Sequence, residues 1–224
     1  MKVKADKISR QYFRRSKGSN VFYAVAEMDF SLASGELAVI IGRSGSGKST
    51  LLNMLAGILQ PTGGQVHYDE TDIYSLDDAK RSVFRNQKIG LIPQGQTGLQ
   101  SLTVLENILL PSRMYADEDK TGEAVALTER LGIAHLQGVY PDELSGGEMR
   151  RLAIARALIC RPAVLLADEP TGDLDDENTH IVLGLLREAA DQGAAVLLVT
   201  HETEAAGYAD HIYRMDGGVL TKEK

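Results

Sequence analysis

Residues 37–50 read LAVIIGRSGSGKST. The first five residues are apolar and β-favouring, and the rest match the pattern G-x-x-x-x-G-K-[ST]. A helical pattern follows at once, over Lys48 to Leu59. This order of strand, glycine-rich loop and helix is the context that a phosphate-binding loop requires. We therefore predict that the segment binds a polyphosphate chain and that it lies in an α/β fold of the P-loop NTPase type.

Each residue type in this loop has a physical purpose. Gly42, Gly45 and Gly47 are expected to adopt backbone angles closed to other residues, so that N–H groups can surround a phosphate. The helix N-terminus adds its positive dipole end. Lys48 is predicted to contact the β- and γ-phosphates, and the Ser49 hydroxyl to bind Mg²⁺. The predicted nucleotide-binding residues of the loop are Gly42, Arg43, Ser44, Gly45, Ser46, Gly47, Lys48, Ser49 and Thr50.

A second apolar strand, from Val164 to Ala167, leads into Asp168 and Glu169. Asp168 is expected to bind Mg²⁺ directly or through water. Because neighbouring strand residues point to opposite sides, Glu169 is free to orient and deprotonate a water molecule. That arrangement favours hydrolysis over nucleotide storage. The alternative is a pair of carboxylates that caps a helix or lies at a solvated edge.

A third buried strand, from Ala194 to Thr200, ends in His201. Open α/β sheets bind ligands at the carboxyl ends of their parallel strands. We predict that the imidazole contacts a γ-phosphate; the alternative is an exposed or helix-capping histidine.

Apolar strands alternate with helical patterns, which predicts a parallel sheet covered on both faces. Helices are also expected over Gly147 to Ile159 and Thr179 to Asp191. An N-terminal antiparallel β-subdomain is predicted from the alternation in Val3 to Phe13 and Val21 to Leu32, with a further strand over Val66 to Tyr68. Residues 95–143 hold no β-run and read as helical, over Val104 to Leu109 and Glu123 to Leu131. We predict one domain, 1–224, with an α/β core (1–94 and 160–224) and an inserted α-helical subdomain (95–159).

Composition narrows the classes of function. The 224 residues carry a formal net charge of −7, which argues against a protein that binds nucleic-acid backbones. Cys160 is the sole cysteine in the sequence, so an internal disulfide or a cysteine-only metal site is excluded. The N-terminus lacks an apolar signal region, and the apolar runs are far shorter than the roughly 18 residues of a spanning helix. We expect a cytoplasmic protein that reaches a membrane only through a partner.

The segment Leu144-Ser145-Gly146-Gly147-Glu148, followed by a helical stretch, resembles the signature of ATP-binding-cassette (ABC) ATPases. The family's other motifs follow in order along essentially the whole chain. Gln94 resembles the Q-loop, Asp175 the D-loop, His201 the switch histidine, and Tyr12 the aromatic residue that stacks on adenine. Phe13 is a rival for that last position, and the alternative for Tyr12 is a core-facing strand aromatic.

The resemblance implies a head-to-tail dimer in which the signature of one subunit faces the phosphate loop of the other. It implies ATP and Mg²⁺ as cofactors, with catalytic roles for Glu169, His201, Gln94 and Lys48. Nucleotide contacts are also implied for Tyr12, Ser145, Gly146, Gly147, Glu148 and Asp175, and metal contacts for Ser49, Gln94 and Asp168. The implied partners are a second copy and a separately encoded membrane permease, which would hold the chain on the cytoplasmic face of the membrane; no nucleic acid is expected.

Residues 85–94 and 102–107 are similar to the branch of bacterial cassettes that release lipoproteins or export macrolides and antimicrobial peptides. The transported substrate and the direction of transport stay open. One alternative is a cassette ATPase of DNA repair or chromosome maintenance, but the long insertion usual in such proteins is absent from this sequence. Another is a nucleotide-binding regulator without turnover, against which Glu169 and His201 argue.

Overall fold

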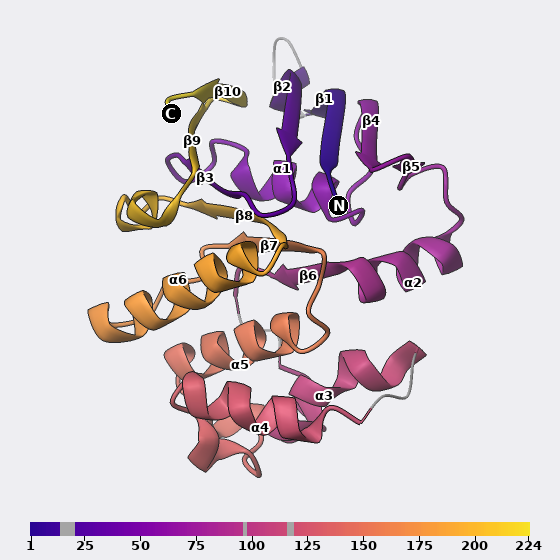
Figure 1. The fold of residues 1–224 in the computed structure, drawn as a ribbon. Coiled ribbons are helices and arrows are strands. Elements are labelled where there is room, and N and C mark those ends of the chain that lie inside the picture. The colour runs from indigo at the N-terminus through magenta and orange to yellow at the C-terminus, as the bar shows by residue number, and fades with distance from the viewer. Residues whose placement is uncertain (14–20, 96–97, 116–118) are drawn as a thin grey trace.

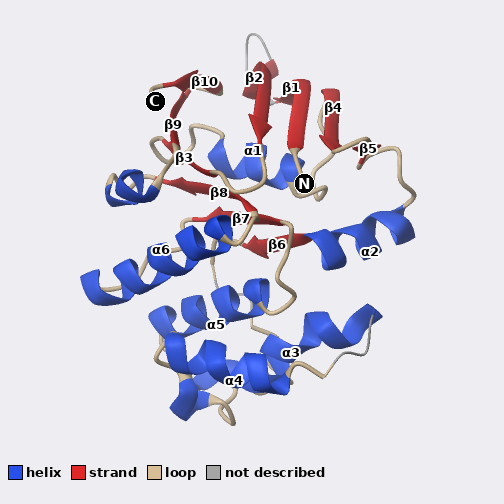
Figure 2. Cartoon of the chain, viewed as in Figure 1, coloured by secondary structure: helices blue, strands red, loops and turns tan. Residues whose placement is uncertain are grey.

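In the computed structural model, which describes residues 1–13, 21–95, 98–115 and 119–224, the chain is arranged in three layers. An antiparallel sheet lies at the top of Figure 1, a mainly parallel sheet lies in the middle, and a layer of helices lies at the bottom. Figure 2 shows that the two sheets occupy one half of the molecule and that the third layer is entirely helical. The predicted α/β architecture is confirmed.

The middle sheet has the strand order β10-β9-β3-β8-β7-β6. All neighbours from β9 to β6 are parallel, and β10 closes the edge as an antiparallel hairpin with β9. The prediction of parallel strands is confirmed for β3, β7 and β8, while β6 and the β9–β10 hairpin were not predicted. The strands are β3 (Leu37–Ile41), β6 (Ile89–Ile92), β7 (Val164–Asp168), β8 (Ala195–Thr200), β9 (His211–Asp216) and β10 (Val219–Lys222).

Strand β3 shows why this sheet is rich in Val, Ile and Leu. All five of its residues are buried, and they alternate between two separate hydrophobic cores. Leu37, Val39 and Ile41 face the core shared with the helical layer, whereas Ala38 and Ile40 face the core shared with the antiparallel sheet. A strand buried on both faces has no polar positions, so its sequence is a continuous apolar run.

The antiparallel sheet has the order β2-β1-β4-β5. Its strands are β1 (Val3–Phe13), β2 (Val21–Leu32), β4 (Gly63–Tyr68) and β5 (Thr71–Asp72). Val3 pairs with Leu32 on one side and with Tyr68 on the other. The predicted antiparallel subdomain is confirmed. Its position above the middle sheet brings the end of β1 over the carboxyl ends of the parallel strands.

Helix α1 (Lys48–Leu55) lies between the two sheets, and α6 (Asp176–Asp191) lies on the opposite side of the middle sheet (Figure 1). Helix α2 (Asp78–Lys88) was not predicted. The helical layer holds α3 (Val104–Tyr115), α4 (Thr121–Arg130) and α5 (Gly146–Leu158), and 3₁₀ turns occur at Ala134–Leu136, Pro141–Glu143 and Glu204–Tyr208.

Helix α1 is shorter than predicted, and α3 is longer. Helix α1 ends at Leu55 because Gly57 adopts a left-handed conformation, with φ at +69°. A Cβ atom there would also stand 2.5 Å from Ile73 Cδ1, so glycine makes this turn at the lowest cost. Helix α3 continues through Pro111 to Tyr115 instead of ending at Leu109.

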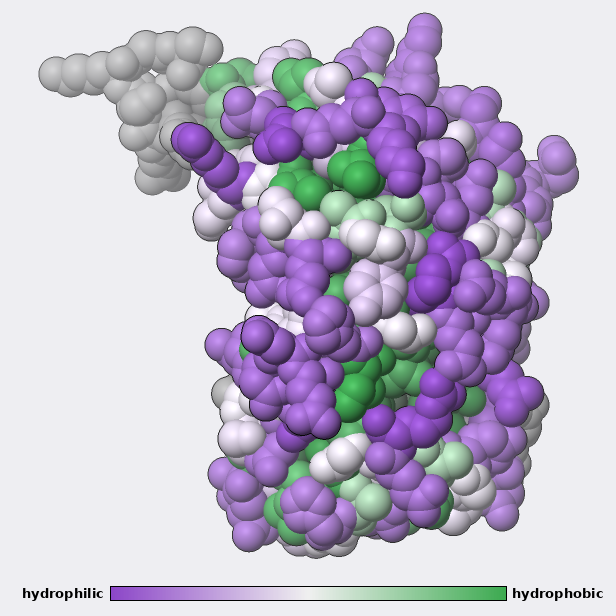
Figure 3. All heavy atoms as spheres, turned by 60° about the vertical axis from the view of Figure 1, so that its left-hand side comes forward, coloured by the Kyte–Doolittle hydropathy of each residue, from purple (hydrophilic) through white to green (hydrophobic). Residues whose placement is uncertain are grey.

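On the face shown in Figure 3, hydrophilic side chains cover most of the area, and hydrophobic ones form smaller patches between them. Within the described ranges, no helix has both the length and the apolar character needed to cross a membrane.

Candidate functional site

Many of the sequence-predicted residues line one pocket of about 890 Å³: Tyr12, the phosphate loop from Ser44 to Thr50, Gln94, Glu169 and His201. Gly42, Arg43 and Asp168 are absent from its lining. The pocket lies at the carboxyl ends of β3, β7 and β8, below the end of β1 and the start of β2. This is the edge at which parallel α/β sheets bind ligands. The pocket is lined by Tyr12, Phe22, Tyr23, Ala24, Ser44, Gly45, Ser46, Gly47, Lys48, Ser49, Thr50, Gln94, Arg150, Glu169, Gly172, Asp173, His201, Gly217 and Gly218.

Two glycines of the phosphate loop adopt the backbone angles that the sequence predicts. Gly45 and Gly47 have φ values of +78° and +107°. Gly42 does not, so that part of the prediction is wrong. Gly42 is needed for a different reason: a Cβ atom there would stand 2.3 Å from the carbonyl oxygen of Met215. The loop therefore passes directly beneath the β9–β10 hairpin.

Lys48 is held by the backbone of its own loop. Its side chain is buried, and Nζ donates to the carbonyl oxygens of Gly42 at 2.6 Å and Arg43 at 3.2 Å. The nearby Ser46 Oγ is also buried and has no hydrogen-bond partner among the described residues. A buried donor without a partner is costly, so a hydroxyl in this position is suited to a ligand oxygen.

Asp168 ends β7 next to the start of α1. Its side chain is buried, and its Oδ1 has no hydrogen-bond partner within the described part of the chain. Burial raises the pKa of Asp168, and the Ser49 hydroxyl acts in the opposite direction. A carboxylate oxygen and a hydroxyl side by side are the hard oxygen ligands that Mg²⁺ prefers, so these two residues fit that ion.

Glu169 lines the pocket where β7 and β8 end. Its Oε2 lies 2.8 Å from Nδ1 of His201 and accepts a hydrogen bond from Thr200 Oγ1 at 3.1 Å. Its Oε1 lies 3.9 Å from Nζ of Lys48. Glu169 also has a φ of +50°, which non-glycine residues rarely adopt and which is characteristic of functional sites. The end of β8 and the start of α1 thus both supply residues that lie beside the Glu169 carboxylate.

The two rival aromatic residues have different surroundings. Tyr12 lines the pocket and stacks on Phe22, with the ring centroids 5.7 Å apart. Phe13, by contrast, is 79% exposed and is absent from the pocket lining. Tyr12 is therefore the one of the two that lines the same pocket as the phosphate loop.

The signature residues do not line this pocket in their own chain. Ser145 caps α5: its Oγ accepts from the Glu148 backbone N–H, and the Glu148 carboxylate accepts from the Ser145 N–H at 2.8 Å. Gly147 lies against Asp173, whose carbonyl oxygen would be 3.1 Å from an added Cβ. The N-terminus of α5 therefore lies beside the segment that follows β7, outside the pocket.

Asp175 is likewise absent from the pocket lining. Its Oδ1 accepts from the backbone N–H of Asn178 at 2.8 Å, which makes it the N-cap of α6. This cap fixes the course of the chain between Glu169 and α6.

Several pocket residues were missed by the sequence analysis, among them Phe22, Asp173 and Arg150. Arg150 could have been found. With Ile154 and Ala157 it occupies positions i, i+4 and i+7 of α5, and all three are buried. An arginine on the buried face of a helix is uncommon and merits a functional interpretation.

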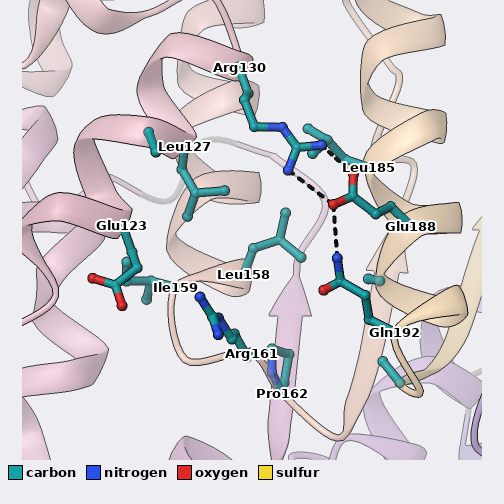
Figure 4. A pocket seen from close by; sticks show the side chains of 13 residues that line it. Glu123, Leu127, Arg130, Leu158, Ile159, Arg161, Pro162, Leu185, Glu188 and Gln192 are labelled. Carbon is teal, nitrogen blue, oxygen red and sulfur yellow. Dashed lines mark hydrogen bonds and ion pairs between the residues drawn. The ribbon is translucent and has the colours of Figure 1, made fainter.

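A second pocket, of about 610 Å³, lies between α4, the end of α5 and α6 (Figure 4). Apolar side chains such as Leu127, Leu158 and Leu185 line it, and an ion pair between Arg130 and Glu188 crosses it. Gln192 donates to the same carboxylate at 2.9 Å. None of the sequence-predicted site residues borders this second pocket.

Comparisons with known proteins agree with this geometry. Residues 25–172 match the ABC transporter family. The chain is 44% identical over 194 residues to the lipoprotein-releasing system ATP-binding protein LolD of Hydrogenovibrio crunogenus, covering 85% of this chain and 84% of that protein. It is 37% identical over 197 residues to the ABC transporter ATP-binding protein YtrE of Bacillus subtilis, covering 87% and 85%. The dimeric ATP-binding cassette MJ0796, solved in a post-hydrolysis state with ADP and Pi, superposes with a TM-score of 0.90 at 31% identity and covers 99% of both chains.

Proposed function

This chain belongs to the ABC transporter family as a nucleotide-binding subunit that hydrolyses ATP, and on that premise we propose how its residues perform the reaction and what it powers. The observation that carries the proposal is the position of Glu169. Its carboxylate lies in the same pocket as the phosphate loop, 2.8 Å from His201 and 3.9 Å from Lys48.

Glu169 is the general base in this proposal. It orients a water molecule and accepts a proton from it as the water oxygen bonds to the γ-phosphorus; the bond between that phosphorus and the leaving oxygen of ADP breaks. His201 and Thr200 hold the carboxylate from one side, so that its orientation does not depend on the bound nucleotide. Lys48 stabilises the negative charge that develops on the phosphate oxygens.

The phosphate loop and Tyr12 bind the nucleotide. Backbone N–H groups of residues 42–50 surround the phosphates, and the Tyr12 ring stacks on the adenine. Ser49, Asp168 and Gln94 are the residues that would hold Mg²⁺, which when bound neutralises charge on the phosphate oxygens. The unpartnered Asp168 Oδ1 supports this assignment.

Two copies form the complete site in this proposal. Ser145, Gly146, Gly147 and Glu148 lie outside the chain's own pocket, yet they present a hydroxyl and backbone N–H groups at the N-terminus of α5. In a head-to-tail dimer they contact the nucleotide of the partner subunit, and Asp175 lies at the same interface. The dimeric relative bound to ADP and Pi supports this assembly. We assign the interface function to the helical subdomain, residues 95–159, and nucleotide binding to residues 1–94 and 160–224.

Dimer closure and opening then power a separate membrane permease. The relatives named as ATP-binding proteins of lipoprotein-releasing systems support lipoprotein release as the process that this subunit drives. Through the permease the chain would lie at the cytoplasmic face of the membrane.

The test is phosphate release by the purified chain with ATP and Mg²⁺, compared with the Glu169→Gln variant. We expect turnover by the parent protein and binding without turnover by the variant. Co-expression with a candidate permease and co-purification from detergent then tests the membrane partner. Turnover without any permease association would leave the ATPase intact and remove the transport function.

A further inference from the structure

We propose that Arg150 is a positioning residue. It ties the segment that contains Gln94 (residues 89–95, the Gln94 segment) to helix α5, so that the segment moves with the helix. The inference rests on the proposed function, because it concerns how the ATP-hydrolysing site is assembled. The same helix carries the signature residues at its N-terminus, one turn before Arg150. Through Arg150, the surface offered to the partner's nucleotide is linked to the segment that borders this chain's own nucleotide.

The direct contact is a hydrogen bond across the two layers. Nη1 of Arg150 donates to the carbonyl oxygen of Pro93 at 2.9 Å. Pro93 follows β6, and its carbonyl belongs to the peptide bond that leads into Gln94. Because a peptide unit is planar, holding this oxygen fixes the plane from which Gln94 starts. Pro93 itself has no N–H, so its carbonyl is its single backbone hydrogen-bonding group.

Packing alone does not explain why a charged arginine occupies this buried position. The residue as a whole is 6% exposed, and none of the ion pairs among the described residues includes it. A buried guanidinium costs free energy unless its donors are used, whereas an apolar side chain would fill the same space without that cost. The guanidinium borders the nucleotide pocket, and its Nη2 lies 4.0 Å from where a Cβ of Gly172 would stand. Arg150 thus lies between two segments of the site, one before Gln94 and one after Glu169.

A second arginine joins the same helical layer to the core at a different place. Arg130 of α4 pairs with Glu188 of α6 across the pocket in Figure 4. Both side chains are nearly half exposed, at 48% and 42%, and neither borders the nucleotide pocket. Exposed pairs of this kind contribute little to stability. Arg130→Met is therefore a matched control: it removes an arginine between the layers without touching the Gln94 segment.

The experiment compares Arg150→Met, Arg150→Lys and Arg130→Met with the parent chain. The kcat and KM for phosphate release, the Kd for ATP, and amide hydrogen exchange in residues 89–95 are measured for each. Phosphate release by the parent chain is established first. If the parent chain releases no phosphate, the proposed function itself fails, and that result is distinct from any effect of Arg150.

In Arg150→Met we expect kcat to fall about ten- to hundredfold, as for a displaced catalytic segment, while the Kd for ATP changes less than about twofold. Hydrogen exchange in residues 89–95 should accelerate. Arg150→Lys, which keeps a charged donor but loses the planar fork, should recover part of the rate. Arg130→Met should behave as the parent.

The proposal is overturned by an unchanged kcat in Arg150→Met, by unchanged hydrogen exchange in residues 89–95, or by an equal loss of turnover in Arg130→Met. Circular dichroism and thermal melting check that each variant is folded. Should Arg150→Met lose its native fold, Arg150→Gln, which retains an N–H donor without charge, is tested by the same measurements and the same criteria.

Discussion

Nδ1 of His201 lies 2.8 Å from Oε2 of Glu169, across the ends of two neighbouring parallel strands. Each residue directly follows its strand, and Asp168 of β7 pairs with Val199 of β8. The two side chains therefore meet because the sheet register brings them together. The contact leaves the second oxygen of Glu169 on the side of Lys48, where the phosphate loop begins α1. This arrangement leads to the first two predictions.

Glu169→Gln should bind ATP normally and lose most of its turnover. The amide has nearly the same shape but cannot accept a proton, and a general base contributes about 10²–10⁴-fold to rate. Phosphate release and ATP titration measure the two effects separately. Glu177→Gln, the same change at an exposed carboxylate of α6 that does not line the pocket, is the matched control and should turn over ATP as the parent does. Turnover by Glu169→Gln at the parent rate would show that another group is the base.

Lys48→Ala should lose affinity for ATP more than for adenosine. The lysine is buried among loop carbonyls. In the proposed site it supplies a cation where the β- and γ-phosphates bind. Isothermal titration with ATP and with adenosine separates phosphate recognition from base recognition. Equal affinity of the variant and the parent for ATP would contradict the role of the phosphate loop.

Tyr12→Ala should weaken ATP binding by roughly 1–2 kcal/mol, about the contribution of one aromatic ring stacked on a base. Phe13→Ala should have no effect, because that ring is 79% exposed and does not border the pocket. Equilibrium binding of a fluorescent ATP analogue to both variants decides between them. A loss confined to Phe13→Ala would move the stacking role by one residue.

Asp210 should stabilise the fold in a pH-dependent way. Its carboxylate accepts from the Leu37 N–H at 2.8 Å and from Arg187 at 2.7 Å, and these bonds hold its pKa below the ordinary value of 3.8. The folded state therefore favours the charged form. The stabilisation is fully present above the ordinary value and is lost as the pH falls through the lower, folded-state pKa.

Urea unfolding tests this by comparing Asp210→Asn with the parent. The difference in the free energy of unfolding should be largest near pH 7 and should shrink as the pH falls below 4. Asp191→Asn, which also removes a carboxylate from Arg187 but at a more exposed site, should show a smaller difference. A pH-independent gap for Asp210→Asn would exclude the charge as its cause.

The elements that the sequence predicted best are those with a single physical explanation. Strands β3, β7 and β8 are buried on both faces, so they appear in the sequence as short apolar runs. The phosphate loop, Glu169 and His201 directly follow their carboxyl ends. Helix α2 was missed because it has no fully buried residue and is mostly polar, with Val83 and Phe84 as its only large apolar side chains. The β9–β10 hairpin was missed for a similar reason, since most of its positions are partly or fully exposed.

The site was less predictable where its geometry depends on contacts between residues that are far apart in the sequence. Gly42 is a glycine because the β9–β10 hairpin lies against it, a contact between residues far apart in the sequence. The left-handed backbone of Glu169 also has no local signal, since glutamate seldom adopts it. The role that we propose for Ser145 to Glu148 depends on a second chain, so a single sequence indicates their chemistry only through the family resemblance.

The most direct test of an ATPase site that two subunits complete together is the rate of phosphate release per subunit, measured with ATP and Mg²⁺ over a wide range of protein concentration. A site completed by a partner's signature predicts a rate per subunit that rises with concentration and then saturates, and that disappears in Glu169→Gln. A rate per subunit that stays constant down to the lowest concentrations, or no phosphate release at any concentration, would contradict the account.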